Sequence, residues 1–77
     1  MTTEQMRERI LTKIKERFNE LQAEEEDLFD AFVKFVKFKN TIELALSLDL
    51  ITMGEYLKHD TAGDHLFHEK QEKLGKK

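Results

Sequence analysis

Helix breakers are missing from the first part of this chain, and their absence limits how it can fold. No proline occurs anywhere, and the first glycine is Gly54. Glycine and proline disfavour a helix interior most strongly, because glycine is conformationally free and proline lacks a backbone donor. We therefore predict an uninterrupted helical pattern up to Gly54. The predicted fold class is all-α, a small helical bundle of three main helices.

The first predicted helix covers residues 3–22. Apolar residues recur along it at spacings of three and four, which places their side chains on one side of a helix. Thr2 or Thr3 is the expected N-cap, and Gln5 completes a capping box with Thr2. We expect an amphipathic helix with one buried stripe. This stripe consists of Met6, Ile10, Ile14, Phe18 and Leu21.

The second predicted helix, residues 26–48, contains four phenylalanines spaced three residues apart, from Phe29 to Phe38. Because a helix turns by about 100° per residue, this spacing winds the rings around the axis instead of aligning them. We expect one side of the helix to face the core, with Phe32 and Phe35 at its centre. The residues predicted for this core face are Leu28, Phe32, Phe35, Ile42 and Leu46.

A second apolar side is predicted on the same helix, from the flanks of the core face to the residues opposite it. The chain has 77 residues and no cysteine, and domains of this size often gain buried area by association. We therefore predict a protein partner and a homo-oligomer, specifically a homodimer formed through this side. The predicted interaction surface is Phe29, Val33, Phe38, Leu44 and Leu48.

The apolar pattern is interrupted by "QAEEED" between the first two helices. Acidic residues stabilise a helix N-terminus through its dipole, so we expect a short connection, with one continuous rod as the alternative. An acidic patch here could also present carboxylates where a partner expects phosphates. Small acidic helical proteins of viral or mobile-element type inhibit host proteins in this way. The patch consists of Glu24, Glu25, Glu26, Asp27 and Asp30.

The third predicted helix covers residues 53–60, with Thr52 and Glu55 in the capping-box positions. The segment "LITMGEYL" is similar to the L-I-T-x-x-E-[FY] hairpin of short C-terminal helical modules of the SHOCT type. It lacks the glycine that those modules carry before the leucine, and the similarity implies no function. We expect Gly63 to interrupt the helix, a loosely held helical turn to follow, and residues 68–77 to fray. Residues 1–77 would form a single domain.

No catalytic or cofactor-binding signature is recognisable. Ser47 is the only serine and has no histidine near it in the sequence, and no glycine-rich phosphate loop occurs. The weak candidates for a metal site are His59, His65 and His68, since two histidines three residues apart on a helix can share an ion. Such pairs on a polar helix surface are usually solvated. We therefore expect a protein that is not an enzyme and binds no cofactor.

Arg9, Lys13 and Arg17 form a basic stripe on the first helix. Such a stripe can contact phosphates, so a nucleic-acid-binding regulator is the alternative function. Each of these residues has a carboxylate within four positions, which cancels much of its field, and the net charge is −3. Our expectation is therefore a small, acidic, cytoplasmic interaction or regulatory protein. We expect no membrane span, because no apolar stretch is long enough.

Overall fold

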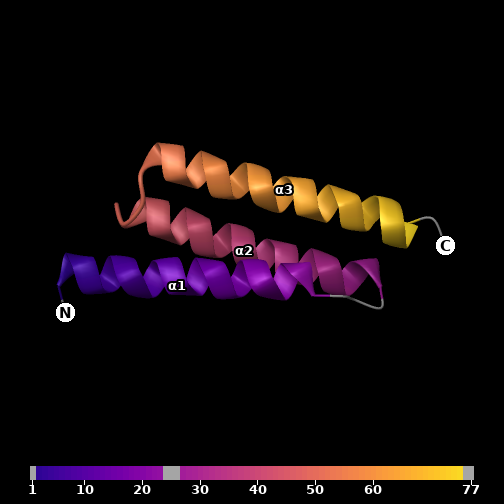
Figure 1. Ribbon diagram of the computed structural model, residues 1–77, viewed down its shortest axis with the longest axis horizontal. Helices are drawn as coiled ribbons and strands as arrows, with labels where there is room; N and C mark the ends of the chain where they lie inside the picture. The colour runs from indigo at the N-terminus through magenta and orange to yellow at the C-terminus, as the bar shows by residue number, and fades with distance from the viewer. Residues whose placement is uncertain (1, 24–26, 76–77) are drawn as a thin grey trace.

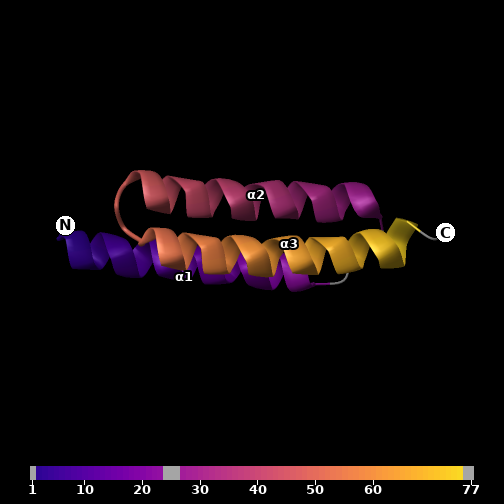
Figure 2. The same cartoon turned by 90° about the horizontal axis from the view of Figure 1, so that it is seen from above.

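The structure is a bundle of three α-helices. The computed structural model describes residues 2–23 and 27–75. The helices are α1 (Thr3–Gln22), α2 (Leu28–Ser47) and α3 (Met53–Gly75), and no strand occurs in the described ranges. Consecutive helices run in opposite directions (Figure 1), and α2 forms a layer opposite α1 and α3 (Figure 2). The predicted all-α class and the separation of the first two helices are confirmed.

Side-chain caps define the starts of all three helices. Thr2 Oγ1 accepts a hydrogen bond from the Gln5 backbone N–H, and the Gln5 side chain accepts one from Thr2 N. Asp27 Oδ1 accepts from the backbone N–H of Asp30 at 2.9 Å and so caps α2. Thr52 and Glu55 form the second capping box, at the start of α3. Both predicted capping boxes are confirmed. They could be predicted from the sequence because such caps depend only on neighbouring residues.

The core lies between the three helices. Phe38 is at its centre, fully buried, with its ring 5.5 Å from that of Phe18 in a tilted arrangement. Within the predicted stripe of α1, Ile14 and Leu21 are buried, and Ile10 and Phe18 pack against the core, whereas Met6 is 39% exposed. The buried apolar residues are Ile14, Leu21, Ala31, Phe38, Ile42, Ala45, Leu50 and Ile51.

The predicted core face of α2 was rotated from the observed one. Phe38, expected on the flank and in the interaction surface, is completely buried, whereas Phe32, expected at the core centre, is half exposed. The prediction was correct for Ile42, which is fully buried, and for Leu46, which packs against the core. It was wrong for Phe32 and Phe38, because it ranked only large apolar residues. The buried line of α2 also includes Ala31 and Ala45, whose short side chains let the neighbouring helices approach closely.

Gly63 explains why Phe38 can be buried. It does not interrupt α3, as predicted, but lies inside the helix against α2. A Cβ atom placed on Gly63 would lie 2.5 Å from Cε2 of Phe38, which is closer than atoms pack. The missing side chain therefore makes room for the Phe38 ring, and α3 extends well beyond residue 60.

The second half of α3 is held against the rest of the bundle, where we predicted a loosely held turn. The ring of Phe67 stacks on the ring of Phe35, with centroids 4.4 Å apart and planes within 6° of each other. Its centroid also lies 6.2 Å from the centroid of the Phe32 ring. Lys70 Nζ donates to the backbone carbonyl of Ala23, at the end of α1, at 2.6 Å. Residues 68–75, expected to fray, are helical in the described structure.

Candidate interaction surface

An apolar surface remains on the outer side of α2 after the bundle has formed. We call it the outer face of α2. Its side chains are exposed by between 37% and 71%, and Phe29 is the most exposed of them. The residues are Phe29, Phe32, Val36, Leu44 and Leu48, the last of which is the C-cap of the helix.

Three of the five residues predicted for the interaction surface lie on this face, namely Phe29, Leu44 and Leu48. Of the other two predicted residues, Val33 is half-buried and Phe38 is fully buried in the core. Sequence reasoning missed Phe32 and Val36. Their signal was a spacing of four, since the positions 32, 36, 40, 44 and 48 form one ridge on a helix, apolar except at the exposed Asn40.

An apolar groove extends this face at the C-terminal end of α2. It has a volume of about 320 Å³ and an almost entirely apolar lining, to which Met6 and Ile10 of α1 contribute. The basic residues Arg9 and Lys13 of α1 also line it. The complete lining is Met6, Arg9, Ile10, Lys13, Leu48 and Leu50. We call it the basic-rimmed groove, and it can accept an apolar group that carries a negative charge beside it.

The opposite end of α2 has the complementary character. Phe29 is 71% exposed there, and both Asp27 and Asp30 are exposed beside it. The Asp27 carboxylate accepts the hydrogen bond that caps the helix. The remaining predicted members of the acidic patch, Glu24, Glu25 and Glu26, lie outside the described residues. The outer face of α2 therefore begins at an acidic, aromatic end and finishes at an aliphatic end. Arg9 and Lys13 of α1 line the groove at that aliphatic end, where the exposed Asp49 follows Leu48 in the chain.

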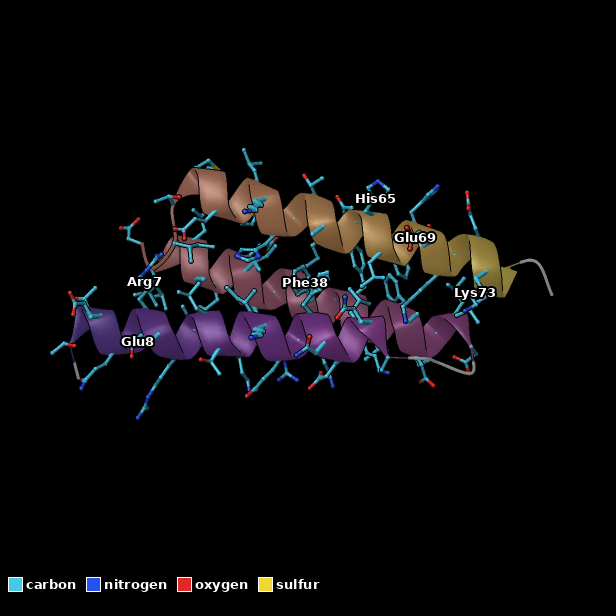
Figure 3. The ribbon with its side chains drawn as sticks, in the orientation of Figure 1. Arg7, Glu8, Phe38, His65, Glu69 and Lys73 are labelled. Atoms are coloured by element: carbon cyan, nitrogen blue, oxygen red, sulfur yellow. The ribbon has the colours of Figure 1, made fainter. Side chains whose placement is uncertain are left out.

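An ion pair joins α1 to the first turn of α3 at the groove end of the bundle. Arg7 donates through both terminal nitrogens to the Glu55 carboxylate, at 3.2 and 2.8 Å, and also to the backbone carbonyl of Leu50 at 2.6 Å. Hydrogen bonds from Arg7, and then from the backbone N–H of Thr52, lower the pKa of Glu55 to about 2. Figure 3 shows Arg7 extending from α1 towards the connection between α2 and α3. Sequence reasoning missed Arg7, although its side chain leaves α1 on the same side as the buried stripe.

A second ion pair joins α2 to α3. Lys39 contacts the carboxylates of Asp60 and Asp64, which lie one turn apart on α3, and its Nζ is 2.7 Å from Asp64 Oδ1. The ammonium also lies over the Phe35 ring, 5.2 Å from its centroid. Partial burial opposes the charged form of Lys39, but the hydrogen bonds and charges of the two aspartates outweigh it and raise the pKa of Lys39. Lys39 is thereby a structural cation and not part of an open basic surface.

The predicted basic stripe lies on the exposed side of α1, partly paired. Arg17 donates to both carboxylate oxygens of Glu20, at 3.2 and 3.1 Å, and Lys13 lies 3.7 Å from Glu16. Arg9 is exposed at the rim of the groove. These short-range pairs are typical of a solvated helix surface, and they reduce the field that a phosphate would meet.

The three histidines are not brought together. His65 and His68 each face a glutamate one turn along α3, at 4.0 and 3.4 Å, and both are well exposed. Figure 3 shows His65 pointing away from the bundle. His59 instead lines a shallow groove between α1 and α3. Among the described residues, no group of three or more histidine, aspartate or glutamate side chains is placed to share a metal ion.

Comparison with known proteins identifies no relative. No family model, no curated protein and no solved structure matches this chain. In the described part of the chain, no helix is long and apolar enough to cross a membrane.

Proposed function

We propose that this protein is a non-enzymatic interaction module with a regulatory role in the cytoplasm, and that the outer face of α2 is its working surface. The observation that supports this proposal most directly is the set of exposed apolar side chains on that face. Single exposed apolar residues are ordinary, but five of them on one side of a helix, interrupted by the exposed Asn40, are typical of a binding site.

The energetic argument concerns what a partner could still bury. Fully burying a leucine or phenylalanine side chain stabilises by about 1.5–3 kcal/mol, and about half of that remains available at each half-exposed residue. Leu44 and Leu48 are 53% and 50% exposed, so folding has used only part of their apolar area. A partner that covers the whole face therefore gains several such increments at once.

Photo-crosslinking in the expressing cell tests this proposal. A photoreactive phenylalanine analogue is placed at Leu44 or Phe29, with Glu72 on the solvent side of α3 as the matched control. We expect discrete protein adducts from positions 44 and 29 and only background from position 72, because the analogue reacts with whatever covers it. Equal labelling at all three positions, or none at 44 and 29, would contradict the proposal. Mass spectrometry of the adducts then identifies the partner.

The alternative function is a nucleic-acid-binding regulator that uses Arg9, Lys13 and Arg17. Two of these three cations lie beside a carboxylate on their own helix, which weakens the support for this alternative. A salt titration of binding to random duplex DNA separates the two functions. Phosphate contacts must weaken steeply as salt rises, whereas contacts to an apolar face depend little on salt.

A further inference from the structure

We propose that the partner of the outer face of α2 is a second copy of this chain, docked antiparallel so that the acidic, aromatic end of each α2 lies over the basic-rimmed groove of the other. This inference rests on the proposed function, because it names the occupant of that same surface. Its support is the complementarity between the two ends of one helix.

The two ends of the outer face fit a two-fold axis. Phe29 and Leu48 are equally distant from a point between residues 38 and 39, and Leu44 is matched by the half-buried Val33. One antiparallel arrangement therefore places Phe29 over Leu48 and Val33 over Leu44, twice each. A closed two-fold contact of this kind is self-complementary and stops at two copies.

The charges favour the antiparallel arrangement over a parallel one. The antiparallel arrangement brings Asp30 of one copy to the groove end of the other, which Arg9 and Lys13 line. Lys13 is shared with Glu16 of its own helix, so Arg9 is the main attraction for Asp30. A parallel arrangement would place acids beside acids and bases beside bases. Charge complementarity of this kind sets the orientation and register of an interface.

The shapes of the two ends also agree. Phe29 is the most exposed large apolar side chain on the outer face. The basic-rimmed groove has a volume of about 320 Å³ and a floor formed by Met6, Ile10, Leu48 and Leu50. An aromatic ring is an apolar group of suitable size for such a groove, and its burial there would leave Asp30 at the charged rim.

A charge-reversal cycle tests the arrangement, measured by analytical ultracentrifugation of the full chain. Asp30→Lys and Arg9→Glu should each weaken the dimer by at least about tenfold, because each substitution creates two repulsive contacts across the symmetric interface. The double variant should return to within about threefold of the original protein. Glu72→Lys, on the solvent side of α3, is the matched control and should leave the dimer unchanged. Circular dichroism of every variant verifies that the monomer remains folded.

The outcomes separate this inference from the proposed function. A dimer that responds to neither reversal, or whose double variant is not rescued, overturns the antiparallel arrangement. A protein that sediments as a monomer at high concentration, yet forms adducts from position 44 with a different protein, overturns the second copy as partner and leaves the proposed function standing. Loss of both self-association and adducts overturns both.

Discussion

Individual residues in this protein act through size as much as through polarity. The clearest case is the contact between Gly63 of α3 and Phe38 of α2, in which a missing side chain accommodates a large ring. Neither residue stands out alone in the sequence, because the glycine reads as a helix breaker and the phenylalanine as one of four in an array. Their pairing gives both a packing role at the centre of the core.

Gly63→Ala should therefore destabilise the protein by about 1–3 kcal/mol through overpacking against Phe38. This would occur although alanine favours a helix interior by about 1 kcal/mol over glycine. The matched control is Gly54→Ala, whose added Cβ would lie 3.8 Å from its nearest neighbour, Thr52 Oγ1. The control should stabilise by about 0.5–1 kcal/mol. Urea unfolding measures both, and an equal gain in the two variants would show that the ring yields without cost.

Among the helices, α2 is central, because it packs against both neighbours and still presents an exposed face. Its buried line and its exposed ridge lie on different sides of the same twenty residues. The array of phenylalanines is divided between these roles. Phe38 is in the core, Phe35 and Phe32 contact Phe67 of α3, and Phe29 is exposed.

Alanine substitutions along the array should show this division. Phe38→Ala should cost about 3–5 kcal/mol, because it leaves a cavity at the centre of the core. Phe32→Ala should cost only about 1–2 kcal/mol, since the half-exposed ring loses mainly its contact with Phe67. Thermal unfolding followed by circular dichroism ranks the two variants. If Phe32→Ala proved the more damaging, the burial described for α2 would be wrong.

Across the whole molecule, a few long-range polar contacts fix how the helices are held together. Arg7 joins α1 to the α2–α3 connection and to the first turn of α3, while Lys39 joins α2 to the middle of α3. Lys70 joins α3 back to the end of α1. Together with the apolar core, these contacts define the relative positions of helices that local sequence leaves free.

The stability of the bundle should consequently depend on pH through Glu55. Its pKa is lowered from 4.5 to about 2 in the folded protein, so at intermediate pH the unfolded chain binds a proton that the folded chain does not. The stabilisation is therefore complete above about pH 4.5 and is lost as the pH falls towards 2. Glu55→Gln keeps an acceptor for the capping box but should show a weaker loss of stability over this range. Glu8→Gln, exposed on α1, is the control and should follow the original protein in urea unfolding at each pH.

The sequence by itself determined the first two helices, the start of the third, the two capping boxes and the existence of an apolar surplus on α2, but not the extent of α3 beyond residue 60. These follow from local rules, because hydrophobic spacing and capping boxes involve residues within one or two turns. Phe29, Leu44 and Leu48 could be placed on the exposed side for the same reason. Only the tertiary structure decided how α2 is rotated about its axis, which buried Phe38 and exposed Phe32. That rotation depends on the volumes that meet between helices, here Ala31, Ala45 and Gly63 against one ring, and spacing along a single helix carries no information about the neighbour it meets.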